Sequence, residues 1–284
     1  MTPWNTSKHF GAALILFSLG ISNAPATDYF SPRTAALGGA GKAGALGTDS
    51  IYLMPAMTSY LHGYAGSVGF FSYGGPDGAE PNGRVYHASA HDGSNEMFQA
   101  GVGYTRRADA TMIHFGASKA ITNVLGFGIG AKRHFHSASL ESVNQTNISG
   151  VFFPLGFLQT SFMVDNILEN NNSKKWNLYR EFSIGTKFNI QKMLLIYIDP
   201  QYTPNKPGKA FGYQAGVELP LFSDLFARAG VNRDALQPHL GSYGRGIGWG
   251  AGWIFPKIAV DFAVYRTIEP VRSDGKVFSA TVSF

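Results

Sequence analysis

The stretch that decides the fold reads FGYQAGVELPL and spans residues 211–221. Its alternate positions from Phe211 to Leu221 are apolar, whereas the positions between them hold two glycines, Gln214 and Glu218. Successive side chains of a β-strand point to opposite faces, so this block predicts a strand with one apolar and one polar face.

The same alternation recurs along the chain from about residue 60 to its end. It is strong in 181–190, 246–255 and 257–266. It is looser in 98–107, 111–121, 124–136, 157–167, 193–203 and 225–232, weaker in 60–73 and 84–92, and doubtful near 148–154. Glycine, proline, asparagine and aspartate separate the blocks, as expected of turns. We expect about 12 strands with room for 14, and the preference of bacterial barrels for even numbers favours 14.

An apolar sheet face must be covered, either by a second sheet in a soluble sandwich or by lipid around a barrel. The opposite face carries glycine, serine, threonine and single charges, which suits a wet or partly filled lumen. Aromatic residues also stand near the block ends, where interfacial girdles occur; they are Tyr104, Phe135, Tyr202, Phe255 and Tyr265. These features predict an all-β fold, a transmembrane antiparallel β-barrel.

The two ends of the chain support export to the bacterial outer membrane. Residues 1–26 contain Lys8, an apolar run over 11–21 and small residues at Ala24 and Ala26, which predicts a signal peptide cleaved near Ala26. The apolar run is too short to span a bilayer as a helix, which needs about 20 residues. The last residues, VFSATVSF at 277–284, resemble the terminal strand that outer membrane proteins present to the barrel assembly machinery, with Phe284 at its end. Outer membrane lipids are the other expected partner.

Residues 29–58 break the alternation and read YFSPRTAALGGAGKAGALGTDSIYLMPAMT. This stretch resembles the N-terminal region of FadL-like transporters for hydrophobic compounds and of the related PorV/PorQ-type barrels. The matching positions are Arg33, Ala35 or Ala36, Gly38, Gly39, Ala40, Asp49, Ser50, Pro55 and Ala56, while Met54 stands where the family usually has asparagine. The resemblance implies that residues 27–58 form a hatch inside a barrel of residues 59–284, with Arg33, Gly38, Gly39, Asp49 and Pro55 on the hatch or the ligand path. The alternative is a periplasmic strand with no gating role.

Whether a residue stands at an odd or even position in its block, which we call its parity, also assigns side chains to the lumen. The polar-face residues are Asp165, Glu181, Lys187, Gln214, Glu218, Arg228 and Asp261. The glycines of 246–252 leave volume on the same face, where a ligand or the hatch would fit.

The sequence gives little support for thiol chemistry, nucleic-acid binding, a nucleotide cofactor or a metal site. There is no cysteine, and only 14% of residues are charged, against about 25% in an average soluble domain. The net charge of +5 comes from basic residues scattered singly or in pairs, so we expect no nucleic-acid binding. Gly39, Gly41 and Gly44 spell GxGxxG without the preceding strand that a nucleotide site requires, and we expect no cofactor. His114, His134 and His136 have no carboxylate nearby in sequence, and we expect no metal.

His87 and Ser89 form an H-x-S pair that outer membrane lipid hydrolases use, with Asp92 or Asn95 as candidate orienting groups. The leading hypothesis remains a non-enzymatic barrel for passive transport of a hydrophobic, fatty-acid-like ligand. A PorV-type structural barrel that binds secreted protein partners is the alternative, and a lipid-modifying hydrolase is the third.

Overall fold

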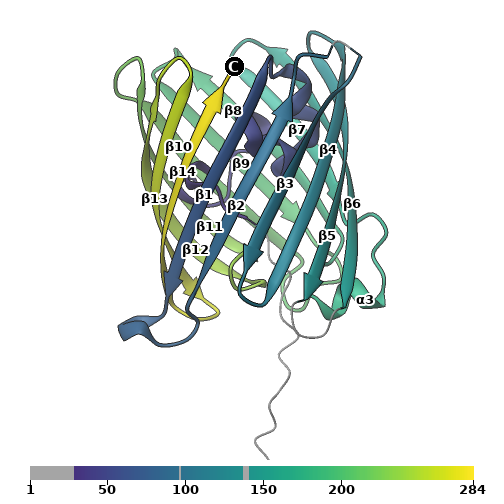
Figure 1. The fold of residues 1–284 in the computed structure, drawn as a ribbon, viewed down its shortest axis with the longest axis vertical. Coiled ribbons are helices and arrows are strands. Elements are labelled where there is room, and N and C mark those ends of the chain that lie inside the picture. The colour runs from purple at the N-terminus through teal and green to yellow at the C-terminus, as the bar shows by residue number, and fades with distance from the viewer. Residues whose placement is uncertain (1–28, 96, 137–140) are drawn as a thin grey trace, which may run out of the picture.

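In the computed structural model, fourteen antiparallel strands form a closed barrel (Figure 1). The structure describes residues 29–95, 97–136 and 141–284, so the expected signal peptide at 1–26 lies outside the described residues. The predicted antiparallel β-barrel is confirmed, including the favoured number of 14 strands.

Each strand pairs with its neighbours along the chain, and β1 pairs with β14 to close the barrel. The strands are β1 (Tyr64–Gly74), β2 (Gly83–Asp92), β3 (Gln99–Arg107), β4 (Ala110–Thr122), β5 (Leu125–His136), β6 (Ser142–Leu155), β7 (Leu158–Asp165), β8 (Glu181–Ile190), β9 (Leu194–Tyr202), β10 (Phe211–Pro220), β11 (Leu225–Gln237), β12 (Ser242–Ile254), β13 (Ile258–Glu269) and β14 (Ser273–Ser283). Beyond β14, the backbone of Phe284 continues the closure, because its N–H donates to the carbonyl of Tyr64 at 2.8 Å.

The alternation read from the sequence sets the two faces of the wall. On β12, Trp249 and Trp253 are 57% and 52% exposed on the outside, whereas the glycines between them face inward. On β10, Gln214 and Glu218 are buried in the lumen, as parity predicts. The outer face is therefore an apolar band, which is the surface that lipid covers in membrane barrels.

Two expectations about the strands are corrected. The doubtful block near 148–154 is part of the full strand β6, which starts at Ser142. Residues 144–147 are polar on both faces, and the pairing with β5 and β7 defines the strand. The first strand starts at Tyr64 because the chain before it forms the 3-10 helix η3 (Pro55–Tyr60).

Tyr265 was expected in an outer aromatic girdle, and this prediction is wrong. It follows Val264 by one position and so points into the lumen, where it is fully buried and its hydroxyl accepts from Asn232 Nδ2 at 2.7 Å. Tyr104, Tyr202 and Phe255 are exposed on the outside, in agreement with the expectation.

The two ends of the barrel differ in their connections. At the end near the C-terminus the turns are short, such as 123–124 and 156–157. The other end carries longer loops, including 75–82 with η4 (Pro76–Gly78) and 166–180 with α3 (Asn171–Lys175), at the bottom of Figure 1. We refer to them as the short-turn end and the long-loop end.

The N-terminal segment, residues 29–60, lies inside the barrel, toward the short-turn end (purple in Figure 1). It consists of α1 (Pro32–Ala36), η1 (Lys42–Gly44), η2 (Gly47–Asp49), α2 (Ser50–Leu53) and η3. In the part of the chain that the structure describes, no helix is long and apolar enough to cross a membrane.

Candidate functional site

Residues 29–60 cross the lumen and contact most of its wall. The helix α1 packs against β11, β12 and β13, η1 against β7 and β8, and η3 against β4, β5 and β6. None of these residues joins the barrel sheet, although the segment is described throughout. We call residues 29–60 the hatch, since side-chain and packing contacts, rather than a backbone ladder, hold them in place.

Glycines on the inner face of the wall allow the first part of the hatch to pack closely against it. A methyl group added at Gly248 would collide with the carbonyl of Ala35, and one at Gly230 with the backbone of Leu37. Gly38 completes the fit, because its φ of +67° is a left-handed conformation that glycine adopts without strain. The predicted glycine wall is thus where the hatch seats.

A buried charge cluster joins the hatch to the wall. Arg33 Nε donates to Glu218 Oε2 at 3.1 Å, and its Nη2 donates to the hydroxyl of Tyr197 at 2.7 Å. On the other side Arg228 Nε donates to the same Glu218 oxygen at 2.5 Å and pairs with Asp261. Two arginines therefore compensate two carboxylates, which is the condition under which buried charges are tolerated.

Two further carboxylates fix the hatch backbone and its turns. Asp199 on β9 accepts the N–H groups of Gly41 and Lys42 at 2.8 and 2.9 Å. Within the hatch, Asp49 accepts from Ser31 Oγ at 2.5 Å and from the hydroxyl of Tyr52 at 3.2 Å. Burial raises the pKa of Asp49 to about 6, against the opposing effects of the Ser31 hydrogen bond and the Arg33 charge.

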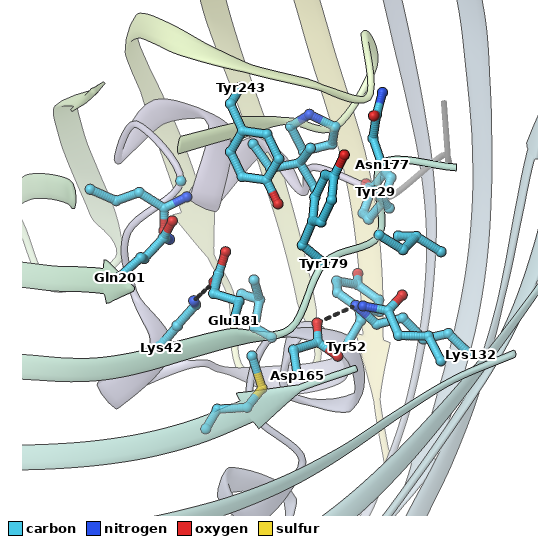
Figure 2. Close-up of a pocket in the computed structure, with 18 of the residues that line it drawn as sticks. Tyr29, Lys42, Tyr52, Lys132, Asp165, Asn177, Tyr179, Glu181, Gln201 and Tyr243 are labelled. Carbon is cyan, nitrogen blue, oxygen red and sulfur yellow. Dashed lines mark hydrogen bonds and ion pairs between the residues drawn. The ribbon is translucent and has the colours of Figure 1, made fainter. Parts of the chain in front are cut away.

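One cavity, which we call the vestibule, opens on the long-loop side of the hatch (Figure 2). Its volume is about 90 Å³. Tyr29 and Tyr52 of the hatch line it together with Tyr179 and Tyr243 of the wall and loops. Two ion pairs face it, Lys42–Glu181 at 3.0 Å and Lys132–Asp165 at 3.5 Å. Leu53, Met163, Leu178, Leu236 and Pro238 add apolar surface, so the lining is amphipathic.

A second cavity of about 200 Å³ lies on the short-turn side of the hatch. Ser31, Arg33 and Asp49 line it from the hatch, and Arg228 and Asp261 from the wall. None of its lining residues lines the vestibule. The hatch therefore stands between two separate spaces in one lumen.

The residues singled out from the sequence occupy the places that parity assigned. Glu218, Arg228 and Asp261 join Arg33 in the charge cluster. Gln214 lies against Gly39, where an added methyl would come within 2.5 Å of its Nε2. Lys187 stands over the Tyr197 ring at 5.9 Å, and Pro55 begins η3 against the wall glycine Gly128.

Several residues of the site were not singled out, among them Lys42, Tyr52, Tyr197 and Asp199. Parity in the block 193–203 places Tyr197 and Asp199 on the inner face, so the sequence held a signal for these two. Lys42 and Tyr52 lie in the irregular hatch, which has no period to read.

The His87–Ser89 pair lies inside the lumen, beside the hatch. His87 Nε2 is 3.0 Å from Ser89 Oγ and 3.2 Å from the Tyr52 hydroxyl, and Nδ1 is 3.1 Å from Thr105 Oγ1. Tyr29 stacks on the ring at 3.8 Å. The candidate orienting groups Asp92 and Asn95 bond elsewhere, at the short-turn end, where Asp92 accepts from the N–H of Ser94 and Asn95 from the N–H of Met97.

No protein-family model and no curated protein matches the sequence. Solved structures resemble the fold. The toluene transporter TodX of Pseudomonas putida aligns with a TM-score of 0.66 at 11% identity, over 92% of this chain and 98% of that chain. The toluene transporter TbuX of Ralstonia pickettii aligns with a TM-score of 0.67 at 11% identity, over 90% and 98%. The outer membrane protein Omp33 of Acinetobacter baumannii aligns at 0.53 and 11%, over 78% and 98%. This chain therefore has the barrel fold of bacterial outer membrane proteins that include hydrocarbon transporters, and a relationship to PorV-type barrels remains a prediction.

Proposed function

We propose that this protein is a passive channel for hydrophobic small molecules in the bacterial outer membrane, and that movement of the hatch opens its path. The main support is the hatch itself, a segment that separates two cavities and takes no part in the wall sheet. The toluene transporters TodX and TbuX share the fold, which supports a hydrophobic solute for this barrel.

The direction of the path follows from the barrel ends. Outer membrane barrels have short periplasmic turns and longer extracellular loops. We infer that the vestibule faces outward and that the second cavity faces the periplasm. The predicted signal peptide at 1–26 and the terminal Phe284, as a contact for the barrel assembly machinery, belong to this proposal.

The vestibule lining suits a small aromatic or amphipathic solute. Tyr29, Tyr52, Tyr179 and Tyr243 offer ring faces with polar edges. Its volume of about 90 Å³ is well below the roughly 300–1,000 Å³ of pockets that hold drug-sized ligands. The closed vestibule therefore has to widen before a solute passes, and the hatch forms part of its floor.

A reversible lock tests hatch movement, because the natural sequence has no cysteine. A methyl at Gly216 would lie 2.9 Å from Leu37 Cβ, so the pair Leu37→Cys and Gly216→Cys needs a shift of under ~1 Å to reach disulfide geometry. The control pair Gly250→Cys and Ala263→Cys lies on paired strands, with the two Cβ positions 3.0 Å apart, and links wall to wall.

We expect a strain carrying the hatch lock to lose uptake of labelled toluene and labelled oleate when oxidised and to regain it on reduction. The wall lock should transport in both states. Undiminished uptake with an oxidised hatch lock would exclude hatch movement from the path. Equal uptake in a gene-deletion strain would exclude the transport function itself.

A further inference from the structure

The outer wall carries a groove that the transport path does not use. It is lined by Arg84, Tyr86, Tyr104, Arg106 and residues 107–108, with a volume of about 590 Å³. Register pairs Tyr86 with Arg106 and Ala88 with Tyr104, so the arginines and tyrosines of β2 and β3 interleave on one face. By parity this face is the outside of the barrel, where all four side chains are exposed.

The groove lies at the rim of the long-loop end. Arg84 is the second residue of β2 and Arg106 the second-last residue of β3. Toward the barrel middle the same face continues with the tyrosines and then with Ala88 and Val102. The arginines thus stand just beyond an aromatic row, at the depth where lipid headgroups meet the apolar band.

More cations extend this rim. Lys276 on β14 and Arg84 on β2 both pair with Ser72 on β1, and Arg133 points outward from β5. We call Arg84, Arg106, Arg133 and Lys276 the cationic patch. Within the described ranges, none of its members has an ion pair with a carboxylate.

The neighbouring sector of the same rim, from β11 to β14, shows a different arrangement. There Arg245 pairs with Glu269 at 3.2 Å, Arg233 with Asp234 at 3.7 Å, and Arg266 with Asp274. The acids closest in sequence to Arg84 lie in the loop 75–82, where Glu80 accepts the N–H of Asn82 at 2.9 Å. Arg233, Arg245 and Arg266 have carboxylate partners in the chain, whereas the cations of the patch have none among the described residues. This difference indicates that the patch is matched to anions from outside the chain.

We propose that the cationic patch binds the phosphate groups of an anionic lipid in the outward-facing leaflet of the membrane. Arginine forks bind phosphate oxygens in pairs of parallel hydrogen bonds, and basic pockets on membrane proteins hold lipid headgroups. Arg84 and Arg106 are the principal ligands, Tyr86 and Tyr104 pack beneath the headgroup, and Arg133 and Lys276 flank it. The site would fix this sector of the wall, β14 to β5, in contact with a bound lipid.

The experiment measures binding of bis-phosphorylated lipid A to the full-length protein in non-ionic detergent, by native mass spectrometry. We expect the double variant Arg84→Gln/Arg106→Gln to bind about 100-fold more weakly, at roughly tenfold for each charge-assisted contact. The matched control Arg245→Gln/Arg266→Gln removes two cations from the same rim and should bind as the unaltered protein does. Dephosphorylated lipid A should bind poorly, and millimolar inorganic phosphate should not displace the lipid.

Heat-dependent mobility on gels checks that each variant forms a folded barrel. If the double variant does not fold, the single variants Arg84→Gln and Arg106→Gln give the same test at about tenfold each. Unchanged binding by these variants, equal loss in the control, or equal binding of dephosphorylated lipid would overturn the proposal. Displacement by inorganic phosphate would assign the site to free anions in place of lipid.

Discussion

Replacing Arg33 by methionine should release the first half of the hatch while leaving the barrel folded. Arg33 donates to Glu218 at 3.1 Å, to Tyr197 at 2.7 Å and to the carbonyl of Gly44 at 3.0 Å. The substitution keeps an unbranched side chain of similar length but leaves all three acceptors without this donor. The wall strands lose no backbone hydrogen bond.

The magnitude follows from the burial of the pair. Removing one partner of a buried ion pair costs about 3–5 kcal/mol. The lower value applies because Glu218 retains Arg228 at 2.5 Å and Tyr197 at 3.1 Å. About 3 kcal/mol corresponds to a rise of roughly 100-fold in the population of the released hatch.

Hydrogen exchange of the detergent-purified protein measures this release. The N–H groups of Gly41 and Lys42, which Asp199 accepts, should exchange about 100-fold faster in Arg33→Met, while amides of β12 and β13 keep their rates. The control Arg245→Met breaks an exposed pair on the outer wall and should cost under about 1 kcal/mol. Unchanged exchange in the hatch of a folded Arg33→Met barrel would refute the anchoring role of Arg33.

Three further predictions concern the hatch and its surroundings. Gly230→Ala places a methyl against the backbone of Leu37, so we expect about 1–3 kcal/mol of strain and a larger single-channel conductance in planar bilayers. The control is Gly66→Ala, whose methyl meets nothing nearer than 3.9 Å. Equal conductances of the two variants would contradict the steric fit of the hatch against the wall. Because burial raises the pKa of Asp49 from 3.8 to about 6, protonation stabilises the closed hatch at low pH, and this stabilisation is lost as the pH rises through that value. Conductance should therefore increase between about pH 5 and pH 7 and become independent of pH in Asp49→Asn; a flat profile in the unaltered protein would argue against it. Burial, with Arg107 nearby, lowers the pKa of His239 to about 3, so its ring resonances in nuclear magnetic resonance should stay constant from about pH 7 to pH 5, whereas a midpoint near the ordinary value would exclude this environment.

The sequence determined the wall of the barrel and which side chains face its lumen. Alternation with a period of two is a local property, so blocks such as 211–221 and 246–255 identify both faces without knowledge of their neighbours. This alternation places Tyr265 inside the lumen, next to the outward-facing Val264. The prediction of Tyr265 in the outer aromatic girdle is wrong because it rests on the position of Tyr265 near a block end and not on the alternation. The strand β6 was uncertain because residues 142–147 show no alternation, and only its two neighbouring strands supply the hydrogen bonds that define it.

The tertiary structure alone decided how the hatch is held and what it separates. Arg33 and Glu218 are 185 positions apart, and Gly38 meets Val231 of the wall, which is even farther away along the chain. No local pattern encodes such contacts, since they arise when a closed sheet brings its inward faces around one irregular segment. The sequence could name Arg33, Asp49, Glu218 and Asp261 as polar. Their gathering at the charge cluster and the second cavity depends on the closure of the barrel, because closure sets which inward side chains meet across the lumen.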